Sequence, residues 1–128
     1  MTPQRLLFPL LGALSAAVLA TSTGPVLAQP PSDCGVPGKP PCPLQHWMRV
    51  NAAAPLAKRE LEGLARAFSA IEQQNPNPKG WGNWGRIARD GEKAAREGSL
   101  SAARQQCGRC HRAYRRAYLL QYRARDVE

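Results

Sequence analysis

The chain has 128 residues and is strongly basic, with 18 Lys or Arg residues against 9 Asp or Glu residues and a formal net charge of +9. One domain is the expected number at this length. Nothing after the N-terminal segment is apolar for long enough to cross a membrane, so we expect no membrane span.

Residues 1–28 have the pattern of a cleaved signal peptide. Arg5 precedes an apolar run from Leu6 to Ala20, and Val26-Leu27-Ala28 provides the small residues that a signal peptidase requires. We expect cleavage near Ala28 and export to the periplasm. The remaining 100 residues lose only the charge of Arg5 and therefore carry a net charge of +8.

The composition of these 100 residues favours an all-α fold. They contain no Thr and five β-branched residues, against fifteen Ala, whereas sheets are rich in β-branched side chains. Ala, Arg, Leu, Glu and Gln lose least on entering a helix. Only twenty large apolar or aromatic side chains are present, so we expect a disulfide, a metal or a cofactor to supplement the core.

Proline divides the start of the mature chain. Residues 29–42 form a Pro- and Gly-rich lead-in without periodicity, and residues 43–128 form the helical domain. Pro43 suits the first position of a short helix. This helix is expected to end near Ala53, because Pro55 disfavours helical geometry in the residue before it.

Three more helices are expected. Apolar side chains recur at three- and four-residue steps over residues 55–73, which predicts an amphipathic second helix. The third starts within residues 81–83 and ends before Gly98. The fourth, capped by Ser99, covers residues 100–123. The predicted fold is therefore an all-α four-helix bundle.

The motif with the clearest chemical meaning lies on the expected fourth helix. Cys107-Gly108-Arg109-Cys110-His111 has the pattern Cys-x-x-Cys-His, which is typical of c-type haem attachment. There the two thiols form thioethers with the porphyrin vinyl groups, and the adjacent imidazole ligates the iron. We expect one covalently bound haem c on this C-terminal helix, held by Cys107 and Cys110, with His111 as the proximal ligand.

Two other chemistries use paired cysteines. A thioredoxin-like redox dithiol belongs in a βαβ context, which this sequence lacks. A zinc site needs four ligands, and the eight-residue separation of Cys34 and Cys42 exceeds the usual spacing of zinc-ligand pairs. A haem-free metal-binding or structural helical bundle is the least favoured alternative.

Cys34 and Cys42 remain once haem has taken two thiols. An even remainder in an oxidising compartment favours a disulfide over two free thiols. This bridge would close a small loop between the lead-in and the first helix, so its stabilisation is expected to be modest, on the order of 2 kcal/mol.

The haem motif and its surroundings resemble the cytochrome c-prime family, the class II c-type cytochromes. The similar features are the segment from Cys107 to Arg115, Trp84 at the start of the preceding helix, and Met48-Arg49-Val50-Asn51 on the first helix. The resemblance implies a four-helix bundle with haem on the last helix and a homodimer as one candidate assembly. It also implies Met48 as the sixth iron ligand, as in the low-spin members of the family.

Helix geometry leaves three alternatives for the sixth ligand. Leu44, Met48 and Ala52 recur every four residues and form the apolar stripe expected to meet the haem. His46 lies about 200° around the helix from Met48 and is expected to point outward, unless the first helix is shifted. The third alternative is five-coordinate iron, with Met48 as a packing residue of the core.

Arginines concentrate towards the C-terminus and fall into two groups. Arg104 and Arg115 project near the direction of His111 and are candidate contacts for the haem propionates. A separate stripe is expected to dock an acidic partner protein and consists of Arg109, Arg112, Arg116 and Arg123. Nucleic acid is disfavoured as a partner by export and by the lack of a reading motif.

These features predict a periplasmic monohaem c-type cytochrome that carries single electrons between redox partner proteins. The alternative is a five-coordinate haem protein that binds a small gas such as NO or CO. The sequence offers no general base, nucleophile or substrate pocket, so we do not expect an enzyme.

Overall fold

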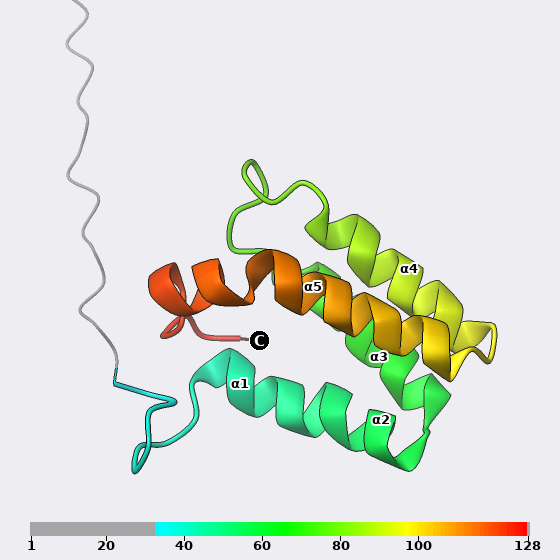
Figure 1. Cartoon of the computed structure of the whole chain (residues 1–128), viewed down its shortest axis with the longest axis horizontal. Helices are drawn as coiled ribbons and strands as arrows, with labels where there is room; N and C mark the ends of the chain where they lie inside the picture. Colours follow the sequence, from blue (N-terminus) through cyan, green and yellow to red (C-terminus); the bar gives the residue numbers. More distant parts are fainter. Residues whose placement is uncertain (1–32, 128) are drawn as a thin grey trace, which may run out of the picture.

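The computed structural model describes residues 33–127, and this part of the chain is helical, with no strand (Figure 1). The all-α prediction is confirmed for these residues, whereas the expected signal peptide at residues 1–28 lies outside them. In chain order the elements are α1 (Pro43–Met48), the π-helical turn η1 (Arg49–Ala53), α2 (Ala54–Lys58), α3 (Leu61–Glu72), α4 (Trp84–Arg96) and α5 (Leu100–Gln121).

The first helix continues past the expected end at Ala53, so that boundary was wrong. The π-helical turn η1 carries the chain into α2, and the Ala54 N–H donates to the Arg49 carbonyl five residues earlier. A π turn shifts the hydrogen-bond register by one residue. Pro55, which has no N–H to donate, therefore falls in the first turn of α2, where that donor is not needed.

The prediction of one second helix over residues 55–73 was also wrong, because the chain breaks between α2 and α3. Arg59 ends α2 in the left-handed conformation, with φ 60° and ψ 29°. The Glu60 N–H then donates to the Pro55 carbonyl over 2.9 Å, which closes the turn. After this turn α3 packs back against η1 and α2.

The last two helices begin and end close to where the sequence predicts. Asn83 precedes α4, and Gly98, with φ 82°, terminates it after Arg96. The Ser99 hydroxyl accepts a hydrogen bond from the Ala102 N–H over 3.3 Å at the start of α5. Both predicted signals, the glycine stop and the serine cap, are confirmed.

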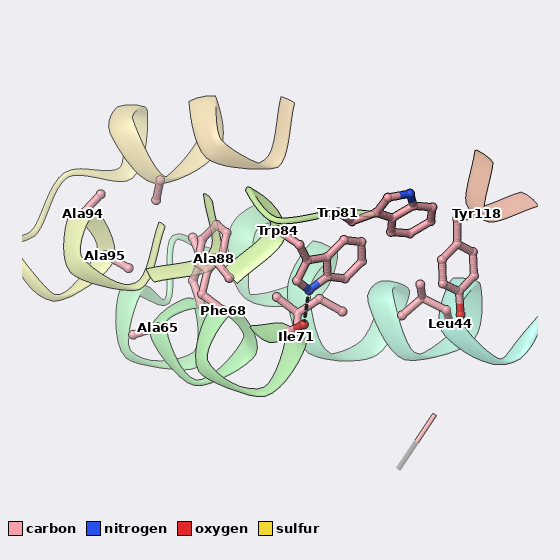
Figure 2. Close-up of a cluster of buried hydrophobic side chains, with 12 residues drawn as sticks. Leu44, Ala65, Phe68, Ile71, Trp81, Trp84, Ala88, Ala94, Ala95 and Tyr118 are labelled. Atoms are coloured by element: carbon pink, nitrogen blue, oxygen red, sulfur yellow. Dashed lines mark hydrogen bonds between the residues drawn. The ribbon is translucent and has the colours of Figure 1, made fainter. Parts of the chain in front are cut away.

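The core is a band of apolar side chains between the helices (Figure 2). α4 packs against α3 and α5, and the Trp84 indole N–H donates to the Ile71 carbonyl of α3 over 2.7 Å. Figure 2 shows the band running from Ala94 and Ala95 to Leu44 of α1 and Tyr118 of α5. Side chains thus connect the first and last helices through one core.

The contact between α3 and α4 depends on Gly91. A Cβ atom at this position would overlap the ring of Phe68. We expect Gly91→Ala to lower the free energy of unfolding by about 1–2 kcal/mol, because overpacking outweighs the gain in helix propensity. Urea unfolding followed by circular dichroism measures the change.

Gly85→Ala on the same helix is the matched control. A Cβ atom there meets only the mobile ends of Arg89 and Glu72, so this variant should be as stable as the wild type or more stable. Equal destabilisation by both substitutions would contradict a close approach specific to Gly91.

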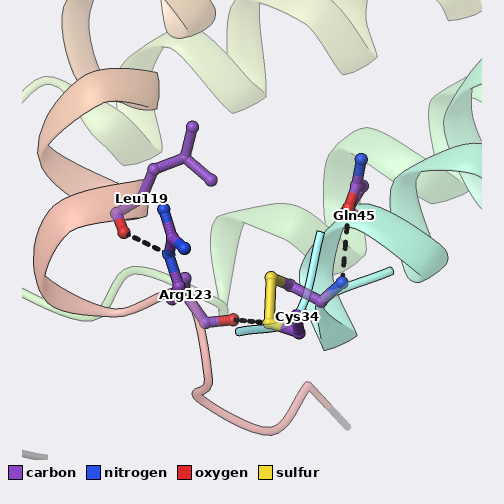
Figure 3. Close-up of a disulfide and its surroundings, with 5 residues drawn as sticks. Cys34, Gln45, Leu119 and Arg123 are labelled. Carbon is purple, nitrogen blue, oxygen red and sulfur yellow. Dashed lines mark hydrogen bonds between the residues drawn. A yellow bond between two sulfur atoms is a disulfide. The ribbon is translucent and has the colours of Figure 1, made fainter. Parts of the chain in front are cut away.

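Cys34 and Cys42 form the predicted disulfide, with an S–S distance of 2.09 Å (Figure 3). The Cys42 backbone N–H also donates to Gln45 Oε1 over 3.3 Å, and the bridge therefore abuts the start of α1. Cys34 Sγ lies 3.8 Å from the Arg123 carbonyl oxygen, just beyond α5. The bridge thus lies between the beginning and the end of the helical domain.

Removing this disulfide should destabilise the domain modestly. We expect Cys34→Ala together with Cys42→Ala to lower the free energy of unfolding by on the order of 2 kcal/mol, the entropy of closing a short loop. Urea titration measures the loss. Reductant should have a similar effect on the wild type and none on the double variant, whereas a wild type indifferent to reductant would count against the bridge.

Candidate functional site

The Cys-x-x-Cys-His motif lies in the middle of α5. Cys107 and Cys110 are free thiols, both half-buried, and both pack against the hydrophobic core. Residues three apart on a helix lie on the same face, so the Cys107 and Cys110 side chains project from the same side of α5. His111 follows them with an exposed side chain at the edge of this face.

Burial controls the protonation of the two thiols. It raises the pKa of Cys107, and it raises that of Cys110 to about 11, with a smaller contribution from the neighbouring Cys107. Redox dithiols depend on the opposite shift, which a helix N-terminus or nearby cations provide. A protonated pair in the middle of a helix does not fit a thioredoxin-like exchange site.

The two ligand candidates on α1 differ in burial. Met48 is half-buried and packs against the same apolar cluster as Cys107 and Cys110. His46 is exposed. Leu44 is buried and Ala52 half-buried, as expected for the apolar stripe that includes Met48.

An aromatic cluster adjoins the motif. The Trp81 ring stacks on Tyr114, three residues after His111, with ring centroids 5.0 Å apart. Trp81 also stacks on Trp84 at 5.8 Å and meets the edge of Tyr122 at 5.5 Å. The sequence placed Tyr114 on the inner face of α5 but did not reveal Trp81 as its partner, because Trp81 lies in a Gly-rich loop without periodicity.

Two arginines flank the motif along α5. Arg104 is close enough to Cys107 to act on its thiol, and its positive charge opposes the effect of burial on the pKa. Partial desolvation and the charge of Arg115 lower the pKa of His111. Both arginines are exposed, and Arg104 also lines a surface hollow together with Arg109 and Arg112.

The four arginines of the other predicted stripe differ in their surroundings. Arg112 and Arg116 are exposed, and Arg109 approaches Asp90 of α4 at 3.7 Å. Arg123 is instead turned back onto the helix, where its Nε donates to the Leu119 carbonyl over 2.8 Å (Figure 3). Sequence reasoning missed Arg86 of α4, which lines a surface hollow with Arg109 and Arg112.

The disulfide restricts which residues could bind a metal ion. Cys34 and Cys42 are bonded to each other and therefore cannot ligate zinc as thiolates. Among residues 33–127, no three His, Cys, Asp or Glu side chains converge on a point where a metal ion would bind. Within the same residues, no helix combines the length and hydropathy that a membrane span requires.

Comparison with models of protein families, with curated proteins and with solved structures finds no match to this chain.

Proposed function

We propose that the protein is a periplasmic monohaem c-type cytochrome that carries single electrons between redox partner proteins. The observation that carries this proposal is the Cys-x-x-Cys-His motif in the middle of α5, with both thiols half-buried beside an apolar, aromatic cluster. Haem c, attached through Cys107 and Cys110, would supply reversible one-electron chemistry.

The residues around the motif fit such a group. Its two thiols share one face of α5, and His111 lies at the edge of that face. Apolar and aromatic side chains from α1, from α5 and from the loop that precedes α4 would exclude water from the haem macrocycle. In the proposed holoprotein these elements form the four-helix bundle that holds the haem.

Individual side chains have distinct proposed roles. His111 would be the proximal ligand, and Met48, the half-buried candidate on α1, would be the sixth ligand. Arg104 and Arg115 would neutralise the haem propionates. Low exposure and a thioether ligand both tune the potential of c-type haem.

A gas-binding haem protein is the second candidate. A methionine packed against an apolar cluster needs no further partner, because its thioether is a flexible packing group. If Met48 serves only in this way, the iron keeps an open position on that side and NO or CO would bind there.

An optical spectrum of the mature protein, produced with a haem-attachment system, separates these alternatives. A low-spin spectrum in both redox states, unaffected by carbon monoxide, is expected for the electron carrier. A high-spin spectrum that shifts with carbon monoxide would favour the gas binder. A chain without a haem band would refute both.

A further inference from the structure

Charge is distributed unevenly over the described helices. α5 carries no acidic residue, and its basic residues are Arg104, Arg109, Arg112, Arg115 and Arg116. Ion pairs with basic residues of α3 and α4 engage Glu62, Glu72 and Glu92 on these two helices, and Glu97 directly after α4. Of the α5 arginines, Arg109 alone forms an ion pair with a described residue, Asp90. The outer side of α5 therefore presents positive charge that this part of the chain does not neutralise.

Two hollows shape this positive surface. The first, of about 370 Å³, lies between the start of α4 and α5, and it is lined by Arg86, Arg109 and Arg112. The second, of about 500 Å³, continues along α5 and is lined by Arg104 together with the same two α5 arginines. Because Arg109 and Arg112 border both hollows, the two form one surface, which we call the arginine groove.

We propose that the arginine groove is where an acidic protein partner docks, with carboxylate side chains of the partner seated in the two hollows. This inference rests on the proposed electron-transfer function and names the surface that function uses. Guanidinium groups bind carboxylates through two parallel hydrogen bonds, and arginines from two helices fix both position and orientation.

The composition of the groove favours a protein over a lipid surface. Its two hollows are shallow and open to solvent. Helices that lie on membranes interleave apolar side chains with their cations. The exposed large apolar residues of the described chain, Val36, Val50, Leu119 and Leu120, do not line either hollow.

The position of the groove suits electron transfer. Arg109 precedes Cys110, and Arg112 follows His111, so the groove is built on the same helical turn as the proposed haem attachment. Cys107 and Cys110 face the core on one side of this turn, and the arginine groove lies on its solvent side. A partner bound there would be separated from the haem by little more than the helix itself.

The test is a binding titration of the ¹⁵N-labelled, haem-loaded mature protein with oxidised, acidic [2Fe–2S] ferredoxin as the probe. No electron needs to pass for binding to be detected. Arg86→Gln together with Arg112→Gln removes two exposed charges without breaking an ion pair. Arg59→Gln together with Lys79→Gln is the matched control, because it removes the same charge from exposed positions elsewhere.

We expect the groove variant to raise the Kd about tenfold at low salt and to weaken its salt dependence, while the control changes the Kd less than twofold. The largest amide shifts should fall on residues 83–87 and 104–112. Equal effects of the two variants, in protein that carries haem, would overturn the docking surface alone. Protein that takes up no haem would overturn the proposed function.

A parallel arm uses phosphatidylcholine vesicles that contain phosphatidylglycerol. If the groove variant loses vesicle binding while its affinity for ferredoxin equals that of the control, the surface meets lipid and protein docking is wrong. If vesicle binding is weak and insensitive to both variants, the proposal stands.

Discussion

Replacing Cys107 and Cys110 together with alanine is expected to abolish covalent haem attachment. The two half-buried thiols on one face of α5 are the free cysteines of the described chain, since Cys34 and Cys42 are bonded to each other. No other described side chain can form a thioether with a haem vinyl group. The effect should therefore be complete, and not a graded loss of affinity.

Haem that survives acid extraction and denaturing electrophoresis measures this attachment, and the mass of the intact chain confirms it. The wild type should retain haem, and each single variant should retain it through one thioether in reduced yield. Cys34→Ala with Cys42→Ala, which also exchanges two cysteines, should keep haem in full. Haem that is freely extracted from the wild type would refute covalent attachment.

The second large effect is expected at Met48. If its thioether ligates the iron opposite His111, Met48→Ala should convert low-spin iron to high-spin and allow carbon monoxide to bind. Met/His ligation also raises the reduction potential, so its loss should lower that potential. Absorbance spectra of both redox states, with and without carbon monoxide, measure the conversion.

Two further variants isolate the role of the sulfur. Met48→Leu keeps the apolar contact with the core but removes the ligand atom, so it should change the spin state as Met48→Ala does at a smaller cost in stability. His46→Ala removes an exposed side chain and should leave the spectrum unchanged. Unchanged ligand-field bands in both Met48 variants would show that Met48 is not a ligand.

Local signals in the sequence were sufficient to predict the two helices in the second half of the chain, α4 and α5. Gly98 and Ser99 mark the junction of α4 and α5 because a left-handed glycine and a capping hydroxyl act within one helical turn. Periodicity likewise placed Ala103, Cys107, Cys110 and Tyr118 on the inner face of α5. The disulfide followed from counting cysteines in a chain that we expect to be exported.

In the first half of the chain, local signals predicted the wrong helix boundaries. Pro55 is a good reason to end a helix, but the π-helical turn η1 shifts the hydrogen-bond register so that the proline falls in the first turn of α2. The real break occurs at Arg59, in a stretch without glycine or proline. Both features lie where α3 packs back against η1 and α2, a tertiary contact that neighbours in the sequence do not reveal.

The sequence alone determined the all-α class, the four helix-forming stretches in outline and the place of the Cys107–His111 motif on the last helix, because propensity and periodicity act within a few residues. Tertiary structure decided what surrounds that motif. Trp81 on Tyr114, and Arg86 beside Arg112, are separated by more than twenty residues in sequence and meet because α4 packs against α5. Such contacts depend on how helices pack in space, which periodicity within one helix does not specify.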